Sequence, residues 1–525
     1  MAEPSPYDTY TSPLATRNAS PEMLRLWSAR HKFNTWRRVW LAVAEAQHEL
    51  GLPVTKEQVE ELRAVVNRPG GITDDEIRLA EKYERELRHD VMAHVHALGD
   101  SCPKAKGIIH LGMTSQDVVC NAELMIFDEA EKLIVGKITK CIVALTTKAT
   151  QFAQMPTLAL THYQPAQPCT VGRRFAMWSS DLVLARLRFT RKDSELYEIN
   201  NRWSHRPWRG IRGATGTQAS FLELCDNSTA RVDRLNYLVW RQLIGQGNAY
   251  DGTSQGNLLA AKFGAKISTT LMGQTYPRVI DTFILADLAS TASVLHKIAS
   301  DIRLLCNRKE LDEPFEDKQI GSSAMPYKRN PMRCERICGL SRFVMNLVGN
   351  AYDTAATQWL ERTLDDSSNR RLSLPEAFLA LDGALDLMHN VASGLIVHEA
   401  MVRKNLMAEL PFMATENILM ACVKAGGEGG RQHYHELIRR HAQAAGLRVK
   451  DEGLDNDLLD RLKADPAFHP PALKHELDWD GLLDPMKYVG RSVEQTERFI
   501  KEVVDPLREQ FGDEINKLGE SGPKV

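Results

Sequence analysis

The stretch Thr114–Met155, TSQDVVCNAELMIFDEAEKLIVGKITKCIVALTTKATQFAQM, contains no proline and only one glycine, Gly136. Proline breaks a helix interior and glycine weakens it, so a run this free of both can form one continuous helix. Its apolar residues recur at mostly helical spacing: Val118, Ala122, Met125, Ile126, Leu133, Ile138, Ile142 and Leu145. About 40 residues would make a rod roughly 60 Å long. Such a rod predicts an all-α protein with a central bundle of long helices.

Two further segments support the bundle. Arg278–Glu313 has neither proline nor glycine, and Val171–Arg206 has only Gly172. Shorter helices are expected before this region, where Ser20-Pro21 matches a helix start and Thr73–Glu76 matches a capping box.

Glycine- and proline-rich pieces break the chain again after about residue 397. We therefore predict an N-terminal helical domain over 1–114, a central long-helix bundle over 115–397, and a C-terminal helical domain over 398–525. No alternating β-branched runs predict a substantial sheet. The polar end, residues 512–525, is expected to be loose.

The charge balance argues against a nucleic-acid or membrane partner. The chain carries 66 basic and 68 acidic side chains, for a formal net charge of -2, so no global field favours polyanions. Its nine cysteines are scattered without C-x2-C pairs, which suits reduced thiols. No signal-peptide pattern and no apolar run near the ~18 residues of a membrane span are present. We expect a soluble cytoplasmic protein.

Three histidines and a carboxylate lie together in "RHDVMAHVH", residues 88–96. On a helix, however, His89 and His96 are about 10 Å apart along the axis while His94 points elsewhere, so the three cannot share one ion. Neither H-E-x-x-H nor a zinc-finger spacing occurs, and we predict no metal site. His89, between Arg88 and Asp90, is either a capping histidine or one that binds an anion or handles a proton.

Two polar loops have both a plain and a functional interpretation. In "LTHYQPAQP", residues 160–168, His162 lies in a turn between two expected rods, as a simple linker or as a general acid. In "GIRGATGTQASF", residues 210–221, backbone N–H groups could bind a carboxylate or phosphate, or the loop could merely be flexible. It is neither a P-loop nor a dinucleotide fingerprint.

Two cationic segments lie near long helices. "LERTLDDSSNRRL", residues 360–372, is either a solvated turn or a set of anion contacts. In "IGSSAMPYKRNPMRCER", residues 320–336, a glycine is followed by two hydroxyl side chains and later by four cationic ones. The segment has few aliphatic residues to bury. Its alternatives are a mobile surface loop or a site where hydroxyls, amides and Lys328 reach one small anion.

These motifs resemble a known family. "GSSAMPYKRNP" is similar to the signature loop of the fumarase/aspartase superfamily, whose members release fumarate from a succinyl group. "RHDVMAHVH", "HLGMTSQDV", "THYQPAQ", "GATGTQASF", "MGQTYPR", "ERTLDDSSNRR" and "ELPFMATENI" follow in the order typical of its adenylosuccinate lyase family. The resemblance runs from about Ser12 to beyond Gly490. Argininosuccinate lyase, fumarase, aspartase or a non-catalytic protein on the same scaffold are the alternatives.

The resemblance implies an all-helical three-domain subunit that forms a homotetramer, with each active site assembled from three subunits. It also implies the substrates, adenylosuccinate and SAICAR, which are cleaved to AMP and AICAR with release of fumarate in purine synthesis. No metal or organic cofactor is implied.

Site residues follow from the same resemblance. It makes Ser322 the general base and His162 the general acid, with His89 assisting, and Lys328 and Asn330 stabilising the dianionic intermediate. Further substrate contacts implied by the matched motifs are Arg88, Asp90, Thr114, Ser115, Thr217, Gln218 and Gln274. Matched nucleotide and phosphate contacts are Arg17, Asn18, Arg336, Arg362, Ser367 and Arg371.

The chain departs from the family pattern in three places. Asn18 stands where animal relatives have an aromatic residue, and the stretches 192–209 and 235–262 are longer than usual. We expect both stretches to be surface excursions, with an effect on access or subunit contacts as the alternative.

Overall fold

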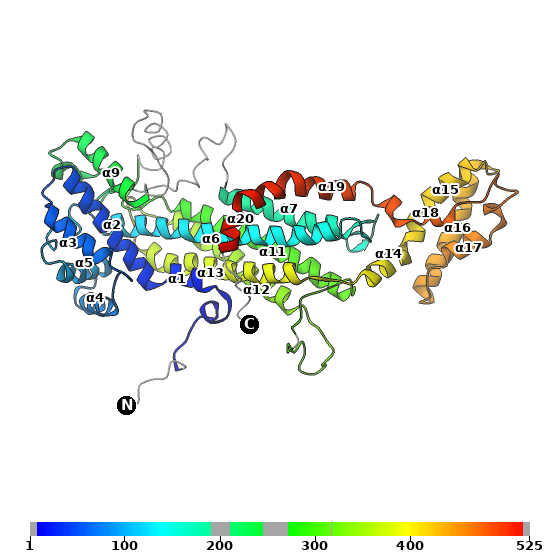
Figure 1. The fold of residues 1–525 in the computed structure, drawn as a ribbon, viewed down its shortest axis with the longest axis horizontal. Coiled ribbons are helices and arrows are strands. Elements are labelled where there is room, and N and C mark those ends of the chain that lie inside the picture. The colour runs from blue at the N-terminus through cyan, green and yellow to red at the C-terminus, as the bar shows by residue number, and fades with distance from the viewer. Residues whose placement is uncertain (1–7, 191–209, 245–270, 317, 518–525) are drawn as a thin grey trace.

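The computed structural model describes residues 8–190, 210–244, 271–316 and 318–517. The described chain is elongated, with a head of short helices at one end, long rods in the middle and a tail at the other end (Figure 1). The prediction of an all-α fold with a central bundle of long helices is confirmed. The rods are α6 (Ser115–Gln151), α7 (Val171–Thr190), α11 (Val279–Asn307), α12 (Met332–Ala356) and α13 (Asp365–Gly394).

The rod predicted from the opening stretch is α6, which begins at a capping box. The Thr114 hydroxyl and the Asp117 carboxylate bond each other's backbone N–H groups and satisfy two donors that a helix start leaves open. Three residues along one stripe, Ile134, Ile138 and Leu145, are fully buried in the core shared by all five rods. Burial of this stripe, at roughly 2 kcal/mol for each large side chain, stabilises a helix of this length.

α13 differs from the expectation that proline ends a helix. Pro375 lies well inside it and leaves the carbonyl of Arg371 without its helical N–H partner. The helix nevertheless continues, because Leu374 and Phe378 on either side of the proline are buried in the rod core. Packing outweighs the loss of one backbone hydrogen bond.

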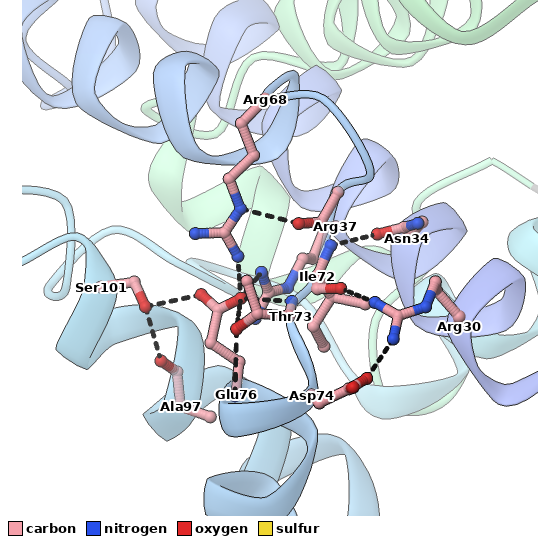
Figure 2. Close-up of polar contacts among 11 residues, drawn as sticks. Arg30, Asn34, Arg37, Arg68, Ile72, Thr73, Asp74, Glu76, Ala97 and Ser101 are labelled. Carbon is pink, nitrogen blue, oxygen red and sulfur yellow. Dashed lines mark hydrogen bonds and ion pairs between the residues drawn. The ribbon is translucent and has the colours of Figure 1, made fainter.

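The head is built on α2 (Ala29–Glu49), α3 (Lys56–Val66), α4 (Asp74–Leu87) and α5 (Asp90–Ser101). The predicted capping box of Thr73 and Glu76 is confirmed at the start of α4. Glu76 also accepts hydrogen bonds from Arg37 of α2, from Arg68 before α4, and from Ser101 of α5 (Figure 2). One buried carboxylate therefore ties the head helices together and fixes the α4–α5 turn.

The N-terminal segment reaches the rods before the head begins. It forms a short π-helical turn, η2 (Leu14–Asn18), and then α1 (Pro21–Leu26). The predicted helix start at Ser20 is confirmed, since its hydroxyl accepts the Met23 N–H at 3.3 Å. Leu14 and Met23 are buried in the rod core rather than in the head.

Two helices from the middle of the chain cover the head. α8 (Ala219–Leu224) and α9 (Thr229–Ile244) belong to the segment expected in the central domain. Yet Ile211, Val232 and Leu235 form a buried cluster with Ala42 and Val43 of α2. The stretch 235–262, expected to be a surface excursion, thus begins with residues 235–244 at the end of α9. Its remainder, 245–262, and the other stretch, 192–209, lie outside the described residues.

The tail extends beyond the far end of the rods and then returns (Figure 1). Its elements are α14 (Glu399–Met413), α15 (Thr415–Lys424), α16 (Gly430–Asp451), α17 (Leu458–Ala464), η4 (Pro466–Phe468), α18 (Trp479–Leu482) and η5 (Pro485–Tyr488). The returning elements are α19 (Ser492–Phe499), η6 (Ile500–Val504) and α20 (Asp505–Lys517).

The returning helices pack on the rods. Val504 is fully buried in the rod core, and Arg508 donates to the Thr146 hydroxyl of α6 at 3.2 Å. Part of the end expected to be loose is therefore helical, up to Lys517. The three-domain division stays a prediction. Side chains from the N-terminal and C-terminal parts are buried in the rod core, so buried contacts cross both predicted boundaries.

Strands among the described residues are only two residues long and form three antiparallel pairs. These are β1 (Pro156–Thr157) with β4 (Cys169–Thr170), β2 (Leu160–Thr161) with β3 (Gln164–Pro165), and β5 (Leu311–Asp312) with β6 (Ile396–Val397). Within the described part of the chain, α11 is the one helix that is by itself long and apolar enough for a membrane span. α14 and α15 taken together are also long and apolar enough, but a 48° bend separates them. Ile284, Leu288 and Leu295 of α11 are buried in the rod core, which accounts for its apolar character.

Candidate active site

The turn between α4 and α5 carries Arg88, His89 and Asp90. Arg88 ends α4 in the left-handed conformation, with φ 55°. His89 caps α5 by accepting the Met92 N–H at Nδ1, 3.3 Å away, and its Nε2 lies 3.3 Å from the Ser115 hydroxyl. His89 thus has the capping role and also contacts a predicted substrate residue at the start of α6.

Asp90 joins this turn to the first turns of α13. Its carboxylate pairs with Arg371 at 2.7 Å. Burial alone would raise the pKa of Asp90, but the Val91 amide and the Arg371 guanidinium outweigh burial and lower that pKa. The structure therefore brings Asp90 and Arg371 together, and Arg371 already has an anionic partner within its own chain.

Asp117 links two predicted substrate loops, and the sequence analysis did not single it out. Its buried carboxylate accepts N–H groups from Thr114 at 2.8 Å, Arg212 at 2.6 Å and Gly213 at 3.1 Å. It therefore holds the glycine-rich loop beside Thr114 and Ser115. An aspartate three residues after Thr114 was a readable capping signal, but its second partner is almost 100 residues away.

The glycine-rich loop is held on its other side by residues 272–274. The backbone of Gly216 lies so close to that of Met272 that an added Cβ would be 2.0 Å from the Met272 carbonyl oxygen. The φ of 84° at Gly216 also requires glycine. The side-chain amide of Gln274 donates to the Ala214 carbonyl at 2.9 Å, and the backbone N–H of Gln274 donates to the Glu361 carbonyl at 3.0 Å. This places Thr217, Gln218 and Gln274 near the turn that carries Arg362.

Arg362 is held by a chain of buried charges. Its Nη2 pairs with Asp366 at 3.3 Å, and Asp366 pairs with Arg278 at 2.7 Å. The Arg362 Nη1 is buried without a hydrogen-bond partner among the described residues of the chain. Burial lowers the pKa of Arg362. One guanidinium nitrogen is thus free to donate, and Ser367 lies close by on the first turn of α13.

His162 lies at the tip of the β2–β3 hairpin, between α6 and α7. A two-residue turn joins Thr161 to Gln164, and both turn residues are left-handed, with φ 54° at His162 and 58° at Tyr163. Two-residue hairpins need such angles, which asparagine and glycine adopt at low cost. Histidine and tyrosine there carry backbone strain, a feature that often marks functional sites. His162 is exposed to solvent.

The loop 320–331 folds on itself before α12. Asn330 donates to the Gly321 carbonyl at 2.9 Å. A Cβ added to Gly321 would lie 2.3 Å from the Lys328 carbonyl, so the glycine lets the two arms meet. The Ser322 Oγ accepts N–H groups from Ala324 at 3.4 Å and Met325 at 3.1 Å. Two N–H donors on one oxygen favour a negative charge there over a neutral hydroxyl.

Glu313 fixes the end of this loop on α12. Its carboxylate accepts the N–H groups of Arg333 at 3.1 Å and Cys334 at 2.6 Å, in the first turn of the helix. Pro331, at the cap position, makes no side-chain hydrogen bond there. Lys328, by contrast, is exposed. The base of the loop is thus anchored, while the segment with Ser322 and Lys328 faces solvent.

Arg17, Asn18 and Arg336 form a separate group at η2 and the start of α12. Burial lowers the pKa of Arg336, and the neighbouring Arg17 and Arg333 guanidinium groups lower it further. Asn18 donates to the Pro13 carbonyl at 3.0 Å, so its side chain closes the turn. Two predicted phosphate contacts are therefore near each other.

The predicted site residues do not converge within one chain. His89 and Ser115 lie at the first turn of α6, whereas the His162 hairpin lies beyond its last turn (Figure 1). The 37 residues of α6 span roughly 55 Å. A site that uses both histidines needs more than one chain.

No group of three or more potential metal ligands occurs among the residues described in the structure. His94, one of the three histidines in "RHDVMAHVH", packs against Phe33 with 3.8 Å between ring centroids. Burial lowers the pKa of His94 to about 4, with smaller contributions from Arg37 and Lys32. It is a neutral residue of the head core.

Comparisons with known proteins decide the family. The "Lyase" family model matches residues 15–202 and 218–346, and the "Adenylosuccinate lyase C-terminus" model matches residues 411–499. An adenylosuccinate lyase from Schizosaccharomyces pombe is 46% identical over 512 residues, which cover 97% of this chain and 98% of the relative. The chain belongs to the adenylosuccinate lyase family. The family member from Saccharomyces cerevisiae is 44% identical over 517 residues, 98% of this chain and 99% of the relative.

Solved structures carry the same fold at lower identity. A 3-carboxy-cis,cis-muconate lactonizing enzyme from Pseudomonas putida matches with a TM-score of 0.70 and 23% identity, covering 93% of this chain and 98% of its own. A fumarate lyase from Mesorhizobium matches with a TM-score of 0.70 and 21% identity, covering 94% and 100%. These matches show that the adenylosuccinate lyase family member shares its fold with a lactonizing enzyme and a fumarate lyase.

Proposed function

We propose that the protein cleaves adenylosuccinate to AMP and fumarate, and SAICAR to AICAR and fumarate, in purine nucleotide biosynthesis. The observation that carries the proposal is the similarity to adenylosuccinate lyases over nearly the whole chain, at 44 to 46% identity. The reaction is a β-elimination. A proton leaves the carbon beside the succinyl β-carboxylate, and the electron pair left on that carbon forms the C=C bond of fumarate. The C–N bond breaks, and its electron pair and a new proton go to nitrogen.

We assign Ser322 as the general base. An ordinary serine hydroxyl is a weak base, so the site must stabilise its alkoxide. Support comes from the two N–H donors on its oxygen and from Lys328 in the same loop. Removal of the carbon-bound proton leaves a dianionic aci-carboxylate, and Lys328 and the Asn330 amide are the groups assigned to it.

We assign His162 as the general acid that protonates the leaving nitrogen. Support comes from its exposed position at a hairpin tip, where its backbone is held at an unfavourable φ of 54°. An exposed side chain on such a hairpin is accessible to a neighbouring subunit. His89 is assigned a supporting role, through its contact with Ser115.

Substrate recognition is assigned to two groups of residues. Thr114, Ser115, Thr217, Gln218 and Gln274, with Arg88 and Asp90, are assigned to the succinyl end. Arg17, Asn18, Arg336, Arg362, Ser367 and Arg371 are assigned to the nucleotide and its phosphate, where a guanidinium matches the geometry of phosphate oxygens. The open Nη1 of Arg362 supports this second assignment.

We further propose a homotetramer in which each site is shared between subunits. If His89 and His162 act on one substrate, their separation along α6 requires that the site contain residues from more than one chain. The rods also present large apolar side chains to solvent in the single chain, among them Leu184 at 62%, Phe283 at 48% and Leu372 at 64% exposure. Rod faces of this kind suit burial against further copies of the chain.

A cytoplasmic location is proposed as well. All nine cysteines are free in the structure, and seven of them are buried, which suits a reducing compartment. We expect the activity to need no metal and no organic cofactor.

The direct test follows fumarate release from adenylosuccinate by the purified tetramer in a spectrophotometric assay, before and after treatment with EDTA. We expect turnover under both conditions and none with argininosuccinate. Turnover of argininosuccinate alone would favour the sibling enzyme. A pure tetramer that releases no fumarate from adenylosuccinate, SAICAR or argininosuccinate would favour a non-catalytic protein.

A further inference from the structure

The N-terminal segment that carries Arg17 lies directly on α13. An added Cβ at Gly383 would be 2.8 Å from the Asn18 carbonyl oxygen, so the two backbones touch with no side chain between them. Two residues later the chain is bonded to the same helix, because the Ser20 N–H donates to the Asp382 carboxylate at 2.7 Å. Asp382 and Gly383 therefore fix where the segment crosses the rods.

Asp382 is itself held by a buried cation. Lys137 of α6 places its Nζ 2.5 Å from Asp382 and 2.8 Å from Asp386. Asp382 is fully buried and the other two are nearly so. Burial alone would lower the pKa of Lys137, but the two carboxylates outweigh it and raise that pKa. A charged lysine thus locks the Asp382 side chain in the orientation that accepts the Ser20 N–H.

The same segment brings Arg17 to the start of α12. Burial lowers the pKa of Arg336, the neighbouring Arg17 and Arg333 guanidinium groups lower it further, and Glu313 raises it. Where Arg17 lies relative to Arg336 depends on how the backbone on each side is anchored. Arg336 is anchored by α12. Arg17 belongs to a five-residue turn, whose anchor on α13 is the contact with Asp382 and Gly383.

We propose that Asp382, locked by Lys137, is a positioning residue that holds Arg17 beside Arg336 for the phosphate group of the nucleotide. The inference rests on the proposed function, and it adds residues that touch neither substrate nor reacting atoms. The affinity for the phosphate group would then depend on the ion pair between Lys137 and Asp382 inside the rod core.

The chain offers two different ways to disturb this anchor. Asp382→Ala removes the acceptor of the Ser20 N–H, and Asp386 still neutralises Lys137, so no uncompensated buried charge is left. Gly383→Ala keeps every charge and pushes on the Asn18 carbonyl instead. The matched control is Asp386→Ala, which removes the other partner of Lys137 and does not touch the N-terminal segment through any bond to Ser20.

The measurement is calorimetric binding of AMP and of adenosine to the wild-type tetramer, to the three variants and to Arg17→Ala. Steady-state kinetics with adenylosuccinate accompany it. We expect Asp382→Ala and Gly383→Ala each to weaken AMP binding and raise KM by about tenfold, a typical loss for one misplaced charged contact. Adenosine binding, kcat and the Asp386→Ala control should change by less than about twofold.

The double variant Arg17→Ala/Asp382→Ala decides how the effect is transmitted. If Asp382 acts through Arg17, the double variant binds AMP as weakly as Arg17→Ala alone. Losses that multiply in the double variant, an equal loss for adenosine, or unchanged AMP binding in Gly383→Ala would each overturn the inference. Wild-type protein that neither binds AMP nor cleaves adenylosuccinate would instead overturn the proposed function.

Discussion

His89 and His162 lie at opposite ends of the same helix, α6, in one chain. His89 contacts Ser115 in the first turn, and His162 follows the last turn on a hairpin. Because a continuous helix cannot bend its two ends together, the catalytic chemistry assigned to both residues depends on association of chains. In the proposed shared site, the rods form the core of the subunit and would also set the distance between partial sites.

Ser322→Ala should remove nearly all turnover and leave substrate binding intact. Loss of a general base typically lowers kcat by about 10²- to 10⁴-fold, and the hydroxyl is one small group among many binding contacts. Stopped-flow or single-turnover assays with adenylosuccinate measure the chemical step, and calorimetry measures binding. Ser323→Ala, next in the loop, is the control and should retain most activity. A normal kcat for Ser322→Ala would remove Ser322 from the role of base.

Asp117→Asn should impair catalysis by releasing the glycine-rich loop. The amide nitrogen would face N–H donors of Thr114, Arg212 or Gly213, so at least one of these hydrogen bonds is lost. Displacing a substrate loop by about 1 Å can lower kcat/KM by about 10²-fold. Asp128→Asn on the same helix weakens a partly exposed ion pair with Lys132 and should leave kcat/KM unchanged. Equal kcat/KM values for the two variants would contradict the role given to Asp117.

Glu76→Ala should destabilise the head strongly. The substitution leaves the buried Arg37 and the partly buried Arg68 without their shared carboxylate (Figure 2). Burial already lowers the pKa of Arg37 to about 10. Removing one partner of a buried ion pair costs about 3–5 kcal/mol. Denaturant unfolding should show this loss, while Asp75→Ala in the same helix turn, where the residue is exposed, should cost under about 1 kcal/mol. Similar unfolding midpoints would argue against the network.

His94 should make the head sensitive to acid. Burial lowers its pKa to about 4 from the usual 6.5, so the unfolded chain binds a proton that the folded chain does not. Stability is therefore full above pH 6.5 and is lost as the pH falls toward about 4, by up to roughly 3 kcal/mol. Thermal unfolding between pH 7.5 and 4.5 measures this slope. His94→Leu should flatten it and His96→Leu should not; equal slopes in all three proteins would contradict the assignment.

Local patterns predicted the fold better than the partnerships within it. The capping residues Ser20 and Thr73 act within a few residues, and the proline-free run of α6 is continuous in the chain, so the sequence displays them directly. Ser20 with Asp382 and Asp117 with Arg212 are separated by 362 and 95 residues. No local pattern specifies which carboxylate meets which N–H across such a separation.

The same limit applies to the site. The motifs singled out arginines by their chemical kind, but they did not distinguish arginines that are engaged inside the chain from those open to a ligand. Arg371 pairs with Asp90, whereas Arg362 keeps one buried nitrogen open. The tertiary packing of α13 against the head and the rods decides this difference, and that packing also carries the helix through Pro375.

Mixing two inactive variants tests most directly whether the sites are shared. His89→Ala and His162→Ala tetramers are each purified, checked for loss of activity, dissociated together and reassembled, with subunit exchange verified by mass spectrometry. If the two histidines of one site come from different chains, random equimolar assembly restores roughly a quarter of the wild-type sites. We predict that fumarate release returns to about that level. Verified mixed tetramers that remain inactive would contradict the account.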